Sequence, residues 1–236
     1  MALPTTTWDD LWTDIVSGGN MRWKRGEAEG NYKRQFEFLH RELTKHHPDR
    51  STFRFLVPLS GDCPFVRYAW SLGHSVCAVD LSKVALAALR AQFAEDSVSW
   101  EESQLGEDGA RVWRSQDGRL EVVCCELITS EATGQLVSGF DAVLDKDAFG
   151  ALAPEVREAY VKRITPLLAP HAQVLLEGKQ RREEDREAGP PFHLDLDKVK
   201  TRWPDFDVVY LGEMPEQPYD IASMKQIGFH LTAKQP

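Results

Sequence analysis

The chain has 236 residues, 42% of them hydrophobic and 28% charged, and its formal net charge is −9. This length and composition suit a single α/β domain, which we expect to span residues 1–236. The acidic balance argues against a nucleic-acid partner, because phosphate contacts need a basic face. No apolar run approaches the roughly 18 residues that a membrane span requires, so we expect no membrane partner.

The four cysteines, Cys63, Cys77, Cys124 and Cys125, lie in or beside predicted core strands. Their spacing matches neither a metal site nor the disulfide framework of a small secreted protein. The N-terminus also lacks a charged segment followed by an apolar one, which is the pattern of a signal peptide. We therefore expect a cytoplasmic protein without a metal.

Aromatic residues mark the start of the chain, where three of the seven tryptophans fall within 23 residues. Apolar side chains recur there at helical spacing, at Trp8, Leu11, Trp12 and Ile15, which predicts a helix. Gly18 and Gly19 end this helix. These indoles either pack the helix on the domain or line a lid over a ligand, and the two interpretations are compatible. We expect residues 1–30, which include Trp23, to form an aromatic N-terminal lid segment.

Helical and strand patterns alternate through the rest of the chain. Helices are predicted over residues 31–46, 64–72, 83–94, 154–168 and 197–203, with Ser82 as an N-cap. Strands are predicted over residues 53–59, 73–80, 111–114, 120–125, 140–144, 173–177, 207–211 and 227–231. Asp117 and Gly118 predict a hairpin turn. From the end of the helix predicted over residues 83–94 to about residue 109, the chain is polar and has no predicted element. The charged run 179–187 is predicted to be a solvated loop.

This alternation favours a parallel sheet that is covered by helices on both faces. The last two strands follow one another without a helix between them, which predicts an antiparallel C-terminal pair. We therefore expect an α/β, Rossmann-like fold with a seven-stranded, mostly parallel sheet.

One βαβ unit carries the pattern of a nucleoside site. An apolar strand runs into a turn at Gly61, and the next strand ends about 20 residues later on Asp80. The glycine lets the backbone approach a ligand, and the carboxylate can accept hydrogen bonds from ribose hydroxyls. The three-glycine phosphate fingerprint is missing, which disfavours a nicotinamide-dependent dehydrogenase. A nucleoside without a pyrophosphate fits better, and S-adenosylmethionine is the foremost candidate.

Six segments along the chain extend this pattern. They are the tryptophan-rich start, VPLSGD at 57–62, GHSV at 73–76 with VDLS at 79–82, the hairpin and strand 117–125, FD at 140–141 with DK at 145–146, and GPPF at 189–192. Taken together, they resemble the thiopurine S-methyltransferase family, a group of class I S-adenosylmethionine-dependent methyltransferases. The resemblance runs from about Trp8 to the C-terminus.

The resemblance implies roles for individual residues. The cofactor-binding residues that it implies are Trp8, Trp12, Trp23, Leu59, Gly61, Asp80, Leu81, Glu126, Leu127 and Asp145. Among them, the backbone at Leu59 and Gly61 would approach the methionine end of the cofactor. Asp80 would hold the ribose, and Glu126 and Leu127 would flank the adenine.

Lys146 stands where the family has an arginine, and Asp147 follows it where the family has a glycine. Methyl transfer from a sulfonium mainly requires alignment and exclusion of water, and a thiol needs only a modest push toward thiolate. Lys146 is therefore the first candidate for stabilising the thiolate. Asp145 or Asp147 is the candidate for taking its proton through water, and a solvated turn is an equal alternative for both. His193 either faces the acceptor or lies on the surface.

We therefore expect an S-adenosylmethionine-dependent methyltransferase that acts on a small soft nucleophile, a thiol first, and forms S-adenosylhomocysteine. A halide, selenium, oxygen or nitrogen acceptor is the first alternative, because related folds share their cofactor residues. A catalytically silent nucleoside-binding protein is the second. The expected partner is a small-molecule methyl acceptor, and we expect the chain to act as a monomer.

Overall fold

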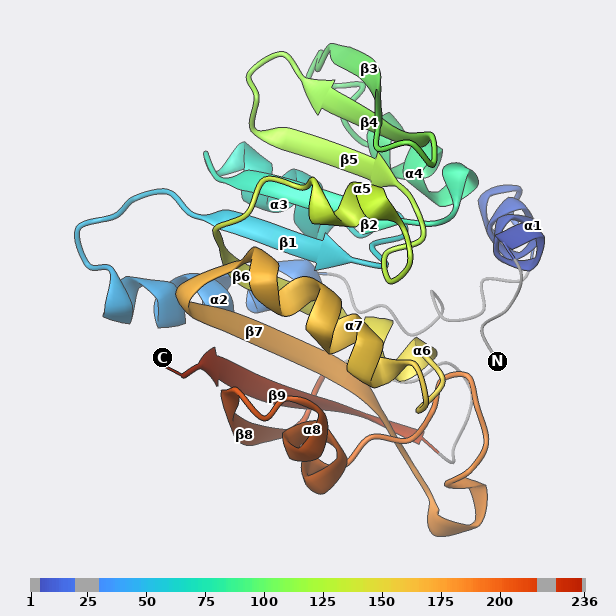
Figure 1. Cartoon of the computed structure of the whole chain (residues 1–236), viewed down its shortest axis with the longest axis vertical. Coiled ribbons are helices and arrows are strands. Elements are labelled where there is room, and N and C mark those ends of the chain that lie inside the picture. The colour runs from blue at the N-terminus through green and yellow to red at the C-terminus, as the bar shows by residue number, and fades with distance from the viewer. Residues whose placement is uncertain (1–4, 20–29, 216–223, 235–236) are drawn as a thin grey trace.

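The structure is a computed structural model that describes residues 5–19, 30–215 and 224–234 (Figure 1). Within these residues, nine strands form one sheet in the order β3-β4-β5-β2-β1-β6-β7-β9-β8. The strands are β1 (Arg54–Pro58), β2 (Ser75–Asp80), β3 (Trp100–Leu105), β4 (Ala110–Ser115), β5 (Leu120–Cys124), β6 (Phe140–Lys146), β7 (Leu168–Arg181), β8 (Phe206–Glu213) and β9 (Met224–Ala233).

The five strands in the middle of the sheet, β5, β2, β1, β6 and β7, run parallel. β9 is antiparallel to both β7 and β8, which confirms the predicted C-terminal pair. At the other edge, β3 is antiparallel to β4, and β4 forms the predicted hairpin with β5. The expected Rossmann-like, mostly parallel sheet is thus confirmed, and it has nine strands in the described residues where seven were expected.

Some segments that were not predicted as strands belong to the sheet, among them β3 and residues 178–181 of β7. β3 is an edge strand whose four central residues are all exposed, so its sequence lacks the alternation that marks a half-buried strand. The predicted strand 173–177 extends to Arg181, because β9 pairs with β7 along this whole length. Lys179 is only 3% exposed, so the prediction of a solvated loop from residue 179 is wrong.

Helices of the described residues connect these strands. They are α1 (Thr5–Val16), α2 (Asn31–His46), α3 (Phe65–Ser71), α4 (Lys83–Ala91), α5 (Glu131–Gly134), α6 (Ala148–Ala151), α7 (Arg157–Ile164) and α8 (Leu196–Arg202), with short 3-10 turns η2 (Thr165–Leu167) and η3 (Glu183–Asp185). α2 has the predicted bounds, and Ser82 caps α4 by accepting a hydrogen bond from the Ala85 amide. α7 is shorter than predicted, since a turn precedes it and Pro166 cannot donate the next helical hydrogen bond.

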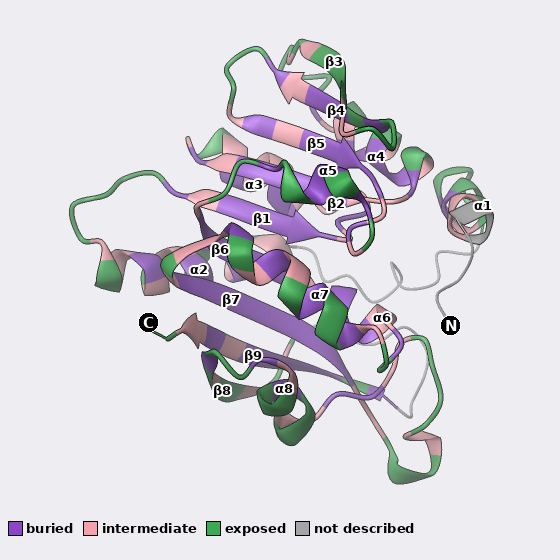
Figure 2. Ribbon diagram, viewed as in Figure 1, coloured by how far each residue is buried: buried purple, intermediate pink, exposed green. Residues whose placement is uncertain are grey.

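The helices cover both faces of the sheet (Figures 1 and 2). α2, α3 and α4 pack on one face through residues such as Phe36, Phe65 and Leu89. α6, α7 and α8 pack on the other through Phe149, Tyr160 and Trp203. No helix in the described ranges is both long and apolar enough to cross a membrane.

Candidate active site

Outside α1, the predicted site residues that the structure describes lie at or just after the carboxyl ends of the parallel strands β1, β2, β5 and β6, which form one edge of the sheet (Figure 1). β1 ends at Pro58 beside Val79 of β2, and β6, on the other side of β1, runs on to Lys146. β1 is also where the strand order reverses, since β2 and β5 lie to one side and β6 and β7 to the other. Open α/β sheets bind their ligands outside the carboxyl ends of the strands at such a point.

One carboxylate ties the turn after β1 to the end of β2. The Gly61 amide donates a hydrogen bond to Oδ2 of Asp80 over 2.8 Å, and the Ser82 amide donates to Oδ1 over 2.8 Å. Leu59 and Gly61 both have positive φ angles, 46° and 53°. A carboxylate has roughly four acceptor positions, so Asp80 can still accept from a ligand.

The environment of Asp80 makes its negative charge costly. Burial raises the pKa of Asp80 to about 6, backbone hydrogen bonds oppose this rise, and the negative charge of Asp9 adds to it. Asp9 reaches the site because Oγ of Ser82 donates to its Oδ1 over 2.6 Å. The sequence did not single out Asp9, since its partner lies 73 residues further along the chain.

Helix α1 packs against the glycine turn. A Cβ atom on Gly61 would lie 2.5 Å from Cζ2 of Trp12, so this indole rests on the backbone of the turn. Trp12 is 6% exposed and packs on Ala85 of α4. Trp8 is half-buried, and Trp23 lies outside the described residues. The placement of Trp12 agrees with both interpretations of the first helix, because a buried indole here also borders the site.

The segment predicted to flank the adenine forms a turn that its own hydrogen bonds hold. Oε2 of Glu126 accepts hydrogen bonds from the amide of Thr129, over 2.6 Å, and from its hydroxyl. Leu127 is 3% exposed within the core. Leu81 is half-buried, and its carbonyl accepts a hydrogen bond from the Cys124 thiol. The Glu126 carboxylate is therefore engaged within its own turn.

Asp145 and Lys146 face opposite sides of the sheet, as neighbours in a strand do. Asp145 is fully buried, with Oδ2 accepting from the Tyr160 hydroxyl over 2.6 Å and Oδ1 from the Phe149 amide over 2.9 Å. Burial raises its pKa to about 6, these two hydrogen bonds oppose the rise, and the charge of Asp147 adds to it. Strand alternation alone predicts that the half-buried Lys146 lies on the face of α2.

A polar cluster lies on this face, at the ends of β6, β7 and β9, and Asp147 is the one member that the sequence had indicated. Its members are Arg34, Gln35, Asp147, Glu177, Lys179 and Gln226. Glu177 is fully buried and accepts hydrogen bonds from Arg34 over 2.5 Å and from Gln35 over 2.7 Å. Its partners lie more than 140 residues away in sequence, so no local pattern reveals them. The signal that the sequence offered was that two charged residues, Glu177 and Lys179, continue the alternating pattern of an apolar strand.

Other reactive side chains lie in the interior. His193 is 5% exposed, and its Nδ1 accepts a hydrogen bond from the Arg181 amide over 3.0 Å, so it is not a surface histidine. Burial raises the pKa of Cys124 to about 11 and also raises that of Cys125. Such thiols are poor nucleophiles, which agrees with their prediction as buried strand residues. No group of three or more His, Cys, Asp or Glu in the described residues is placed to hold a metal ion.

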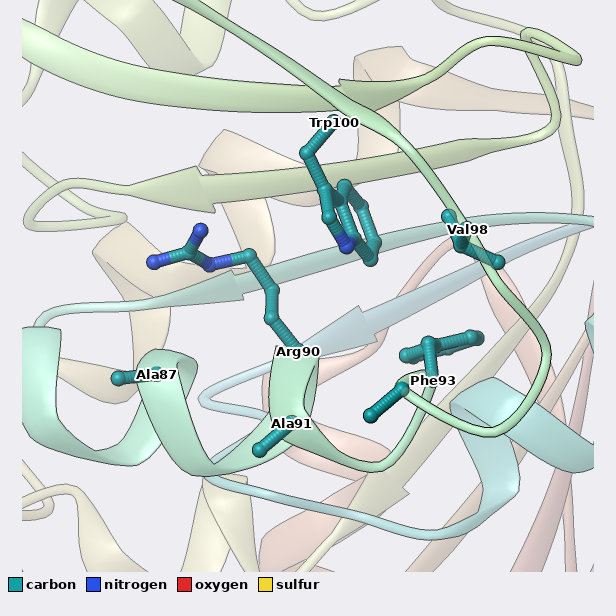
Figure 3. A pocket seen from close by; sticks show the side chains of 7 residues that line it. Ala87, Arg90, Ala91, Phe93, Val98 and Trp100 are labelled. Carbon is teal, nitrogen blue, oxygen red and sulfur yellow. The ribbon is translucent and has the colours of Figure 1, made fainter.

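A cavity of about 330 Å³ lies between α4 and the segment that follows it in the chain (Figure 3). Its walls are Ala87, Arg90, Ala91, Phe93, Ala94, Val98 and Trp100. Because α4 begins at the carboxyl end of β2, its last turn, which lines the cavity, points toward the opposite edge. Most of the lining is apolar, and the cavity contains none of the predicted site residues.

Comparison with known proteins shows which family and which proteins this chain resembles in sequence. The family model for Thiopurine S-methyltransferase matches residues 6–209. The chain is 28% identical over 165 residues to the thiopurine S-methyltransferase of Mus spretus, a match that covers 67% of this chain and 66% of that protein. It is 26% identical over 180 residues to that of Equus caballus, covering 76% and 71%. The chain thus matches slightly less than two thirds of the length of the mouse relative.

Solved structures share the fold at low sequence identity. One is the magnesium protoporphyrin IX methyltransferase of Synechocystis PCC 6803 with bound S-adenosylhomocysteine, with a TM-score of 0.63, 11% identity and coverage of 98% and 96%. Another is the 1,6-didemethyltoxoflavin-N1-methyltransferase of Burkholderia thailandensis, with a TM-score of 0.57, 16% identity and coverage of 100% and 92%. With the family model matching most of its length, the chain belongs to the thiopurine S-methyltransferase family.

Proposed function

We propose that the chain is an S-adenosylmethionine-dependent methyltransferase that methylates a small soft nucleophile, a thiol first. The observation that supports this most is the contact between Gly61 and Asp80 at the reversal of the strand order. It places a backbone turn and a carboxylate side by side, where an open α/β sheet binds a nucleoside. Membership of the family supports the same cofactor and reaction.

The residues present fit this cofactor. Asp80 is held at both oxygens by backbone amides and keeps acceptor capacity for ribose hydroxyls. Leu59 and Gly61 supply the turn that would approach the methionine end, and Trp8 and Trp12 on α1 would cover it. Leu81, Glu126 and Leu127 would border the adenine, with the Glu126 carboxylate fixing the turn.

The chemistry assigns separate tasks to the residues at the end of β6. When bound, S-adenosylmethionine supplies an electrophilic methyl group, whose bond to sulfur breaks as the acceptor's electron pair forms the new bond. Lys146 would stabilise the anionic acceptor with its positive charge. Asp145, with both oxygens engaged in the core, would act as a positioning residue that fixes the backbone of Lys146 through Tyr160 and Phe149.

The remaining features of the proposal concern the whole chain. We take residues 1–236 as one methyltransferase domain, in which the first 30 residues form the lid. A small-molecule acceptor and a monomeric enzyme suit the formal net charge of −9. A cytoplasmic location suits its four free thiols, which a reducing compartment preserves.

A labelled-methyl assay tests the proposal. The purified chain is incubated with S-adenosylmethionine that carries a deuterated methyl group and with a thiol, a selenol, iodide, a phenol or an amine, and mass spectrometry then identifies the products. We expect a labelled thioether as the main product. Label only on oxygen or nitrogen contradicts the choice of acceptor. Binding of the cofactor without transfer to any acceptor points to a silent nucleoside-binding protein.

A further inference from the structure

Asp147 occupies an unusual position at the end of β6. It precedes α6 with a φ of 61°, in the left-handed region that residues other than glycine adopt infrequently. An aspartate before a helix usually caps it, but here Asp145 accepts the hydrogen bond from the Phe149 amide. The side chain of Asp147 makes no capping hydrogen bond and points elsewhere.

Two buried side chains hold this carboxylate. Nζ of Lys179 lies 3.2 Å from Oδ2 of Asp147, and Nε2 of Gln226 donates to Oδ1 over 3.3 Å. Lys179 also donates to Oε1 of Gln226, which closes the set of three. Lys179 and Gln226 are 3% and 1% exposed, whereas the side chain of Asp147 is 27% exposed. The carboxylate is thus fixed from the interior and open toward the surface.

The backbone places this carboxylate at the end of β6, the strand end to which the proposed function assigns the acceptor. Asp147 directly follows Lys146, and its amide donates to the carbonyl of Glu177 over 2.8 Å. Glu177 and Lys179 are two residues apart in β7 and therefore lie on the same face of the sheet. The Arg34–Glu177 pair is thus next to the Lys179–Asp147 pair. Each pair joins a buried side chain to a partly exposed one, Glu177 to Arg34 and Lys179 to Asp147. Such a pair adds little stability on balance, because desolvation of the buried partner offsets the attraction between the charges. Stability alone therefore does not explain two such pairs at this edge of the sheet.

We propose that Asp147 is the group that receives the proton of the methyl acceptor, and that Lys179 and Gln226 position it. This inference rests on the proposed function. As a protonated thiol is activated, its S–H bond breaks, the electron pair stays on the acceptor sulfur, and the proton moves to a carboxylate oxygen of Asp147. The partial exposure of Asp147 then lets the proton pass to solvent, and Lys146 stabilises the sulfur anion.

This role distinguishes two kinds of acceptor. A thiol that arrives with its proton needs a group to receive that proton, whereas an acceptor that is always an anion, such as iodide, has no proton to lose. Asp147 therefore matters for the first kind and not for the second. A carboxylate that served only to pair with Lys179 would matter equally for both.

The substitution D147N tests this inference in the full chain. General acid–base groups contribute roughly 100-fold or more to rate, so we expect turnover of 2-mercaptoethanol, which is almost fully protonated at pH 7, to fall by about 100-fold at that pH. The loss should shrink as the pH rises and the free thiol ionises without help. Turnover of iodide should not fall. Affinity for S-adenosylhomocysteine, measured by calorimetry, should stay within about twofold.

A matched control is D141N, on the opposite end of β6. Asp141 is also buried and forms an ion pair, with both of its oxygens 2.8 Å from Arg50. We expect D141N to lower the unfolding temperature without changing the pH profile of thiol turnover. If D147N fails to fold, the double variant D147N/K179Q removes both charges of the pair and is measured instead.

The outcomes separate the inference from the function on which it rests. Equal losses with thiols and iodide, or a loss with thiols that does not depend on pH, overturn the role of Asp147. Unchanged thiol turnover in D147N also overturns the role of Asp147. A wild-type chain that binds the cofactor but methylates no thiol overturns the inference together with the proposed acceptor. Absence of cofactor binding in the wild type contradicts the proposed function itself.

Discussion

The Gly61 amide donates a 2.8 Å hydrogen bond to the Asp80 carboxylate and thereby joins the turn after β1 to the end of β2. The two residues are 19 positions apart in sequence, and the parallel pairing of their strands brings them together. The Ser82 amide completes the same arrangement at the other oxygen. The contact fixes the conformation of the proposed cofactor site before any ligand is bound.

Substitution of Gly61 tests the packing of α1 on this turn. In Gly61→Ala the new Cβ would lie 2.5 Å from Cζ2 of Trp12, and the φ of 53° disfavours any side chain. We expect the variant to displace the indole, to lose about 1–2 kcal/mol or more of unfolding free energy and to bind S-adenosylhomocysteine less tightly. Tryptophan fluorescence, urea denaturation and calorimetry measure these three effects.

Gly118→Ala is the matched control for this prediction. Gly118 has a φ of 69° in the turn between β4 and β5, and a Cβ there would meet no atom within 4 Å. It shares the backbone strain without a contact with Trp12. We expect its cofactor affinity to be that of the wild type. Equal losses of affinity in the two variants would show that the contact with Trp12 does not matter.

The burial of Asp145 predicts a pH dependence of stability. Its folded pKa of about 6 lies above the ordinary value of 3.8, so the folded state holds the proton more tightly. The contribution of Asp145 to stability therefore falls as the pH rises from about 4 to about 6. His74, whose pKa burial lowers to about 4, acts in the opposite direction over an overlapping window. Asp80, whose pKa burial also raises to about 6, acts in the same direction as Asp145. The wild-type curve alone therefore does not separate the contributions of these three groups.

The variant Asp145→Asn isolates this contribution. Asparagine can accept from the Phe149 amide and donate to the Tyr160 oxygen, so we expect the fold to persist. Relative to the wild type, its unfolding free energy should rise across the window, by up to roughly 3 kcal/mol for a pKa shift of about two units. Urea denaturation of both proteins at several pH values measures the difference. A difference that stays constant with pH contradicts the assignment.

Lys146 is predicted to act on the acceptor and not on the cofactor. In Lys146→Met the thiolate loses a charged partner, an interaction of about 1.5–3 kcal/mol, so we expect kcat for thiols to fall roughly 10–100-fold. Affinity for S-adenosylhomocysteine should change by less than about twofold. Lys162→Met, at an exposed lysine paired with Glu158 on α7, serves as the control. Wild-type turnover in Lys146→Met would contradict the role of Lys146 in stabilising the thiolate.

Local sequence patterns predicted the parts of the fold that depend on local interactions. The period of apolar residues gave both ends of α2, and Asp117 with Gly118 gave the hairpin of β4 and β5. Asp80 was placed correctly at the end of its strand, because an apolar run ended there. β3 was missed because an exposed edge strand has no apolar period.

The polar part of the site depends on tertiary contacts instead. Lys179 stands in a charged run, and its burial follows from Asp147 and Gln226, which lie 32 and 47 residues away. Asp9 reaches the site only because α1 packs on α4. The sequence could have predicted that the side chains of Asp145 and Lys146 point in opposite directions, since neighbouring residues of a strand do so.

Calorimetric titration of the purified chain with S-adenosylmethionine and S-adenosylhomocysteine tests the central claim most directly. We expect one-to-one binding of both, with a loss of affinity of at least about tenfold in Asp80→Ala, because removal of a charged hydrogen-bond acceptor costs roughly 1.5–3 kcal/mol. Failure of the wild type to bind either compound would contradict the cofactor site. Unchanged affinity in Asp80→Ala would contradict the role of Asp80 in holding the ribose.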